Sequence, residues 1–170
     1  MRTRRRAAGF TIIEVLMVIV IVGILVALGM PSMRDLIAST KVKTATSDVF
    51  ASLIFARSEA IKRNAAIEIV PVVATNWNAG WSVNPAGTTT KLTVQDPITG
   101  DVAVTGPNAT LRYRGNGRLT DAASGAAMTV EFQFIATAFS HIQMRCIKIA
   151  PSGRPSVRMD TDRVPANGCN

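Results

Sequence analysis

Apolar and polar positions divide the chain into three parts with different periodicities. From Phe10 to Met30 almost every side chain is apolar, and residues 15–30 contain no polar or charged side chain. As a helix, this run of 21 residues would be about 32 Å long, close to the thickness of the hydrocarbon core of a bilayer. The pattern therefore predicts a transmembrane helix over residues 10–31.

A buried core helix or a cleaved signal peptide would also produce a long apolar run. Buried helices seldom extend this far without a polar position, and signal peptides usually have a shorter run that ends at a small-x-small site. Here Pro31 and Ser32 lead into a charged segment, so a retained membrane helix is favoured. Residues 1–9 hold four arginines and no acid, so the positive-inside rule predicts a cytoplasmic N-terminus, with residues 31–170 outside the cytoplasm.

Residues 32–64 follow a helical period. Their apolar side chains recur at steps of three and four, which puts them on one helix face. The recurring positions are Val42, Ala45, Val49, Leu53, Ala56 and Ala60, widened by Phe50, Ile54 and Ile61. We expect this face to pack on the C-terminal part of the chain and the helix to end at residues 62–64. Pro31 should kink or loosen the join between the two helical parts.

After Asn64 the period shortens to two, which is typical of strands. Short alternating segments are separated by turn sequences rich in Gly, Pro and Asn. The predicted strands are 65–73, 80–83, 91–95, 101–104, 110–114, 128–135 and 141–150. Many short strands without intervening helices predict an antiparallel sheet domain over residues 65–170, with Pro71 at a strand edge or bulge.

The composition limits the functions that fit this pattern. A hydrophobic content of 48% excludes a disordered chain, and 5% aromatic residues offer little stacking surface for single-stranded nucleic acid. The sequence has one histidine and no acid pair, nucleophile–base arrangement or phosphate-binding loop, so we expect neither an enzyme nor a bound cofactor. The one glycine-rich segment, RGNGRL at 114–119, fits a hairpin turn.

Glu14 is the one acid inside the apolar run. A carboxylate at the centre of a membrane helix is unfavourable by about 2.5–3.5 kcal/mol, and by less near the interface. One interpretation is an acid that reaches the interface. Another is a carboxylate that pairs with a new amino terminus at Phe10, because residues four apart share a helix face, or with the Phe10 amine of the next subunit in a packed array of helices.

The first thirty residues resemble a known signal. The segment RRRAAG-FTIIEV, with Gly9 before Phe10 and Glu14 four residues later, is followed by a long apolar helix with Pro31 near its end. It resembles the class III signal sequence of type IV pilins and type II secretion pseudopilins. The resemblance implies cleavage between Gly9 and Phe10 by a prepilin peptidase, N-methylation of Phe10, and assembly with other pilins or pseudopilins.

Two later segments resemble the GspH/FimT branch of that superfamily: FASLIFARSEAIKRNAAIEIVP at 50–71 and IKIAPSGRPSVR at 147–158. The branch includes FimT- and FimU-type minor pilins and the H-type minor pseudopilins. The resemblance implies an α+β fold, in which a long N-terminal helix packs on a C-terminal domain of two small antiparallel sheets. It also implies a minor pilin that primes pilus assembly or, alternatively, a minor pseudopilin of type II secretion.

The predicted domains are accordingly a cleaved basic leader at 1–9, a membrane or filament-core helix at 10–31, an amphipathic helix at 32–64 and a β-rich domain at 65–170. The protein is expected in the bacterial inner membrane, with its globular domain in the periplasm, and then in the pilus or pseudopilus.

Cys146 and Cys169 are the only cysteines, and both fall in the predicted extracytoplasmic part. An oxidising compartment favours a disulfide between them, with a chain-entropy contribution of about 3–4 kcal/mol. A metal site shared with His141 lacks the usual ligand spacing, and redox catalysis lacks a CxxC motif. We therefore expect a structural disulfide and no bound metal.

The C-terminal tail concentrates positive charge. Of the net charge of +8, residues 1–9 hold +4 and residues 141–170 hold +3. Arg154 and Arg158 lie four apart, so on a strand they would face the same side about 13 Å apart. We expect Arg145 and Lys148 to face the same groove, with Arg163 following.

Two interpretations of this tail remain open. The arginines form a solvated face or lock the tail through salt bridges to Asp160 and Asp162, or they form a strip that binds phosphates. In the FimT subgroup, a Gly-Arg motif in the tail is associated with DNA capture during natural transformation, and Gly153-Arg154 with Arg158 resembles it. The strip Arg112, Arg114 and Arg118 around Tyr113 would extend such a patch or form a polar strand face.

Overall fold

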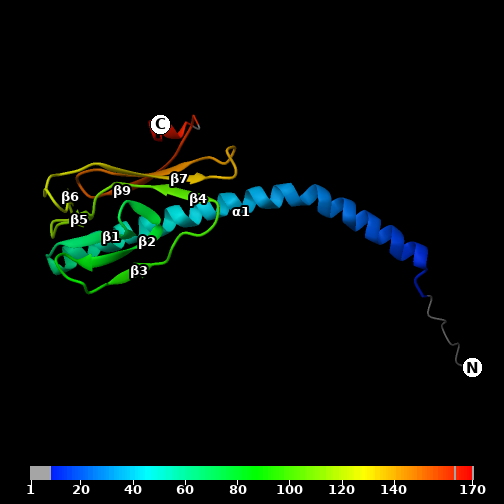
Figure 1. Ribbon diagram of the computed structural model, residues 1–170, viewed down its shortest axis with the longest axis horizontal. Helices are drawn as coiled ribbons and strands as arrows, with labels where there is room; N and C mark the ends of the chain where they lie inside the picture. Colours follow the sequence, from blue (N-terminus) through cyan, green and yellow to red (C-terminus); the bar gives the residue numbers. More distant parts are fainter. Residues whose placement is uncertain (1–8, 163, 170) are drawn as a thin grey trace, which may run out of the picture. The chain divides into compact units, whose positions relative to one another are not determined.

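The computed structural model describes residues 9–162 and 164–169, and the chain divides into two compact units. The first ends at Leu36 and the second runs from Ile37 to the C-terminus. Figure 1 shows the elements of both. The basic leader before Gly9 and the arginine at position 163 lie outside the described residues.

Helix α1 (Ile12–Arg63) contains both helices expected from the sequence. It begins at Ile12, two residues later than predicted, and it continues through position 31 without interruption. A proline removes only one backbone donor, so it does not by itself end a long helix. In the first unit, residues 9–30 are all exposed, and α1 contains a window with a mean hydropathy of 3.0. By length and composition α1 is able to cross a membrane.

The C-terminal end of α1 is closed by a Schellman motif. Asn64 adopts a left-handed conformation (φ 47°), its N–H donates to the Ile61 carbonyl at 3.2 Å, and the Ala65 N–H donates to the Ala60 carbonyl at 3.1 Å. In the last turn the Arg63 guanidinium pairs with Glu59 at 2.6 Å, and this hydrogen bond lowers the pKa of the Glu59 carboxyl. The predicted helix end is confirmed.

The first sheet contains five strands in the order β3-β2-β1-β5-β6. Their bounds are β1 (Ile67–Val73), β2 (Asn76–Pro85), β3 (Thr93–Gln95), β5 (Leu111–Tyr113) and β6 (Leu119–Asp121). The pairing of β1 with β2 is irregular between Pro71 and Val73, as expected for a bulge at the proline. β6 was not predicted, although it is the return strand of the hairpin that the RGNGRL turn indicates.

The second sheet contains four strands in the order β4-β7-β8-β9. Their bounds are β4 (Val102–Thr105), β7 (Val130–Ala136), β8 (Arg145–Ile149) and β9 (Pro155–Met159), and a short 3-10 helix, η1 (Pro165–Asn167), follows. All paired strands in both sheets are antiparallel. The strand predicted from His141 begins only at Arg145, because the Ile142 N–H donates to the Phe139 carbonyl and turns the chain there.

The core of the second unit lies between α1 and the sheets. The six stripe residues predicted from the sequence are each at most 3% exposed: Val42, Ala45, Val49, Leu53, Ala56 and Ala60. Phe50 is partly buried, but Ile54 and Ile61 remain 42% and 49% exposed, so they do not widen the stripe. The Trp77 ring packs edge-on against Phe132 at a centroid distance of 4.8 Å, and its N–H donates to the Pro107 carbonyl. One helix on two antiparallel sheets is the α+β, type IV pilin-like class expected from the sequence.

Two neighbouring helix residues test this packing. Leu53 is 1% exposed and Ile54 is 42% exposed. We expect Leu53→Ala to lower the free energy of unfolding by about 2–5 kcal/mol, because it leaves a cavity between α1 and the sheets. Ile54→Ala, the matched control, should cost less than about 1 kcal/mol. Urea denaturation of the full chain in mild detergent, followed by tryptophan fluorescence, measures both; equal losses would contradict the packing.

Candidate functional site

The start of α1 carries the residues of the predicted processing and assembly site. The Thr11 hydroxyl accepts a hydrogen bond from the Glu14 N–H at 3.3 Å, so Thr11 caps the helix and Glu14 lies in the first turn. Thr-x-x-Glu is the spacing of a capping box. The sequence contains this spacing, but the capping role of Thr11 was not predicted from it. Gly9 and Phe10 precede the helix, and Phe10 is 83% exposed. In the uncleaved chain Phe10 lies ahead of the helix, so a helix face shared by Phe10 and Glu14 after cleavage stays a prediction.

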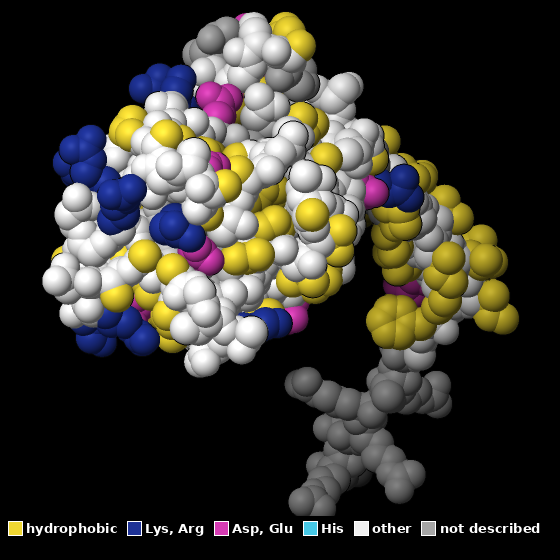
Figure 2. Space-filling model, turned by 60° about the vertical axis from the view of Figure 1, so that its left-hand side comes forward, with side chains coloured by type: hydrophobic (Ala, Val, Ile, Leu, Met, Phe, Trp, Pro, Cys, Tyr) yellow, Lys and Arg dark blue, Asp and Glu magenta, His cyan; other side chains and the backbone are white. Residues whose placement is uncertain are grey.

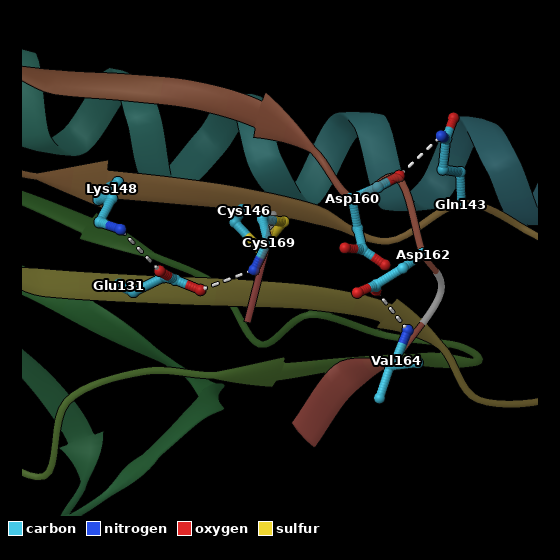
Figure 3. Close-up of a disulfide and its surroundings, with 8 residues drawn as sticks. All are labelled: Glu131, Gln143, Cys146, Lys148, Asp160, Asp162, Val164 and Cys169. Carbon is cyan, nitrogen blue, oxygen red and sulfur yellow. Dashed lines mark hydrogen bonds and ion pairs between the residues drawn. A yellow bond between two sulfur atoms is a disulfide. The ribbon is translucent and has the colours of Figure 1, made fainter. Parts of the chain in front are cut away.

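The C-terminal tail is held against the outer face of the second sheet by a disulfide and one carboxylate. Cys146 of β8 and Cys169 are bonded, with their Cα atoms 6.0 Å apart. The Glu131 carboxylate of β7 accepts a hydrogen bond from the Cys169 N–H at 3.2 Å and pairs with the Lys148 ammonium at 3.8 Å (Figure 3). Met144 is buried with both cysteines in a small second cluster. Sequence reasoning did not find Glu131, which is 38 residues from Cys169.

The strand register separates the cations that were expected in one groove. Directly opposed residues of an antiparallel pair share a face, so Arg158 lies on the face of Cys146 and Lys148. Arg145 is opposite Met159 and Phe134, on the face toward α1, and its guanidinium donates to the Met159 sulfur at 3.7 Å. The expectation that Arg145 and Lys148 face one groove is therefore wrong, because three residues along a strand reverse the face.

Arg154 and Arg158 remain exposed. Within the described residues, neither guanidinium makes an ion pair or hydrogen bond. Asp160 is completely buried, and its two carboxylate oxygens have no hydrogen-bond partner in the described part of the chain. Asp162 accepts hydrogen bonds from the Val164 N–H and the Asn167 amide (Figure 3). Salt bridges from Arg154 or Arg158 to these acids therefore do not lock the tail.

In the second basic strip, two of the three arginines bind groups within the globular unit. The Arg112 guanidinium pairs with Glu68 at 2.8 Å, and the Arg114 guanidinium donates to the Gly125 carbonyl at 2.9 Å. Tyr113 between them is buried, and burial raises the pKa of its hydroxyl. Arg118 is exposed. Among the described residues, its guanidinium has no ion-pair partner.

Two turns bring Arg118 and Arg154 to the same end of the second unit. Gly153 has φ 78°, and a Cβ atom there would lie 2.0 Å from the Gly117 carbonyl oxygen. That carbonyl also accepts a hydrogen bond from the Arg57 guanidinium at 3.1 Å. The turn after β8 therefore packs on the turn between β5 and β6. Figure 2 shows lysine and arginine side chains spread over the face of the globular unit turned to the viewer.

His141, the third candidate metal ligand, lies in an exposed turn with its ring edge-on to Phe139 at 6.0 Å. Among residues 9–162 and 164–169, no group of three or more His, Cys, Asp or Glu side chains is placed to hold a metal ion.

The contact between the two turns predicts unequal effects of two glycine substitutions. Gly153 and Gly87 both have positive φ, but nothing lies within 4 Å of a Cβ atom at Gly87. We expect Gly87→Ala to cost about 1–2 kcal/mol from backbone conformation alone. Gly153→Ala should cost at least about 2 kcal/mol more, because the new methyl group overlaps backbone. The same urea denaturation compares them, and similar midpoints would contradict the close contact.

Comparisons with known proteins agree with this geometry. The family model described as Type II transport protein GspH matches residues 45–153, and the model described as Prokaryotic N-terminal methylation motif matches residues 4–30. Comparison with curated proteins gives no match.

Two crystal structures of the type IV minor pilin FimU of Pseudomonas aeruginosa (strain PAO1) have a similar fold. In space group P21 the TM-score is 0.59 at 20% identity, covering 72% of this chain and 90% of that one. In space group P65 the TM-score is 0.56 at 21% identity, covering 70% and 92%. Because the GspH model matches more than half of the sequence, the chain belongs to the GspH family of type IV pilin-like and pseudopilin proteins.

Proposed function

We propose that this protein is a minor type IV pilin that is cleaved between Gly9 and Phe10 by a prepilin peptidase, N-methylated at Phe10 and incorporated into the pilus, where it primes assembly. The observation that carries the proposal lies in the first unit. Residues 9–30 are exposed on all sides, and they include a capped helix start with one acid in its first turn. Such a helix needs a membrane or a packed array of similar helices around it.

Glu14 has a specific role in this proposal. An unpaired carboxylate in an apolar helix is unfavourable, by about 2.5–3.5 kcal/mol at the membrane centre and by less near the interface. Cleavage after Gly9 would create a positive amine at Phe10, and the amine of an adjoining subunit would offset this cost. The exposed position of Phe10 ahead of the helix supports pairing between subunits.

The proposed location follows from the same helix. Residues 10–31 cross the inner membrane once with a cytoplasmic N-terminus, and the rest of the chain lies in the periplasm until assembly. Residues 1–9 are then the leader, residues 32–64 the amphipathic half of the helix and residues 65–170 the globular domain. Its partners are the prepilin peptidase, the membrane, and other minor and major pilins.

Substitution of Glu14 tests the assembly role. We expect Glu14→Ala to be processed by the peptidase normally but to be lost from the sheared filament fraction, because the helix no longer offers a partner for the amine. The control is Asp48→Ala, which removes a helix carboxylate outside the apolar run. Immunoblots of membrane and filament fractions measure both, and normal piliation and secretion with Glu14→Ala would contradict the role.

The alternative is an H-type minor pseudopilin of a type II secretion system, which the description of the matching family model favours. The likeness to FimU lies below 25% identity and is a likeness of fold. Neighbouring genes distinguish the two: other minor pilin genes support the pilus, whereas genes for secretion-channel components support the pseudopilus.

A second candidate function is DNA binding for uptake, and the exposed arginines at one end of the second unit favour it. Arg154, Arg158 and Arg118 are exposed and carry no ion pair within the described residues. Guanidinium groups suit phosphate, so binding would follow the backbone of duplex DNA with little sequence preference. Lys148 is paired with Glu131 and Arg145 faces α1, so the strip is narrower than expected from the sequence.

Salt dependence tests this second function. We expect the full chain in detergent to retard duplex DNA at low salt. The Arg154→Gln, Arg158→Gln variant should bind more weakly, with a slope of log affinity against log salt flatter by about 1–2. Lys91→Gln, an exposed cation elsewhere, is the control. Electrophoretic mobility shifts measure the affinities, and no retardation by the wild-type chain at high micromolar concentration would exclude DNA binding.

A further inference from the structure

A groove in the second unit runs between α1 and the free edge of the second sheet. It consists of two adjoining hollows of about 360 and 280 Å³ that share Lys43 of α1 and Arg145 of β8. Phe50 and Val157 line the first hollow, and Ile142 and Met159 line the second. The groove thus combines apolar side chains with the polar Ser39, Thr46, Ser47 and Gln143, and it has two cations where the hollows adjoin.

The edge of the groove is an unpaired strand. β9 is the last strand of its sheet within the described residues, so one row of its backbone groups has no neighbouring strand. Val157 and Met159 are opposite Ile147 and Arg145, on the face toward α1, yet they remain 43% and 54% exposed. Exposed apolar side chains on an open edge are typical of a surface that another chain covers.

The two cations indicate the charge of that chain. Among the described residues, neither Lys43 nor Arg145 has an ion pair, and no acidic side chain is among those that line the two hollows. The Arg145 guanidinium instead donates to the Met159 sulfur at 3.7 Å. A chain that covers the groove would leave both cations unneutralised unless it brought a carboxylate, because burial of an unpaired charge is strongly unfavourable.

The strands of this chain do not supply that carboxylate. The other edge strands of the two sheets are β3, β4 and β6. β3 and β4 contain no acid. Asp121 of β6 already accepts hydrogen bonds from the Ala123 N–H and from the Ser124 N–H and hydroxyl. The exposed acids near these strands lie only beside them, at Asp96 after β3 and Asp101 before β4, so we take a different chain as the occupant and make a second copy of this chain an outcome of the test.

We propose that the groove receives an extended segment of a neighbouring, non-identical filament subunit, which adds to β9 as a fifth strand of the second sheet. Its apolar side chains contact Phe50, Val157 and Met159, and one carboxylate lies between Lys43 and Arg145. Alternate residues of an added strand face the groove, so the segment carries apolar and acidic side chains at every second position. This docking rests on the proposed function, since it requires neighbours in a filament.

Site-specific photocrosslinking in cells that assemble filaments tests the docking. A photoreactive residue replaces Val157 of the full chain or, as a control, Val94, which is 51% exposed on the edge of the other sheet. We expect an adduct from position 157 but not from 94. Mass spectrometry should place the crosslink on an extended segment of another pilin-like subunit, next to an Asp or Glu.

Charge reversal tests the carboxylate. Lys43→Glu with Arg145→Glu should reduce the adduct at least about tenfold. Lys91→Glu with Arg118→Glu, which changes the net charge equally, should leave it unchanged. Because Arg145 is half-buried, Lys43→Glu is also measured alone, and the disulfide, seen as mobility on non-reducing gels, reports that each variant is folded. A carboxylate-to-lysine change in the partner should restore the adduct with the reversed groove.

The docking is overturned by equal adducts from positions 157 and 94, by an adduct that does not respond to charge reversal, or by an adduct to a lipid or a second copy of this chain. The filament fraction of the same cells separates this result from the proposed function. A chain that enters filaments without the adduct overturns the docking alone, whereas a chain that stays out of filaments with Glu14 intact overturns the filament role and the docking with it.

Discussion

The close packing of one helix face on two sheets is the constraint on which the globular unit depends. Ala45, Ala56 and Ala60 are almost completely buried on α1, and such short side chains let the helix backbone approach the strands. Over residues 12–30 the same helix is exposed on all sides, and Glu14 is its one charged side chain there. The two parts of the helix therefore differ: the part in the second unit buries one apolar stripe, whereas residues 12–30 are exposed on every face.

Sequence patterns predicted the features that depend on residues only a few positions apart. The buried stripe, the helix end and the RGNGRL turn all follow from spacing within a few residues, and they are confirmed. β6 was missed because a strand of three residues is too short to show a clear period. The position of Arg145 was missed because residues three apart on a strand, such as Arg145 and Lys148, point to opposite faces. The anchoring of the tail by Glu131 depends on strand pairing between distant segments, so no local pattern contains it.

The structure also changes the meaning of the net charge. Many of the cations after residue 31 are committed to the fold: Arg112 to Glu68, Lys148 to Glu131, and Arg57 and Arg114 to backbone carbonyls. A basic composition therefore overstates the surface that is open to a polyanion. Among the cations that remain exposed, Arg118 and Arg154 lie at one end of the unit, where the contact between Gly153 and Gly117 brings their turns together.

The two faces of β9 have different surroundings. On the outer face the disulfide and Glu131 hold the tail over the sheet, and Arg158 is the charged residue of the strand. On the face toward α1, two apolar side chains stay exposed beside two cations that have no ion pair in the described part of the chain. Solubility alone would favour charged residues on an exposed edge strand rather than this combination. A positively charged groove with exposed apolar side chains beside an unpaired strand is instead complementary to an extended segment of another chain that carries apolar and acidic side chains.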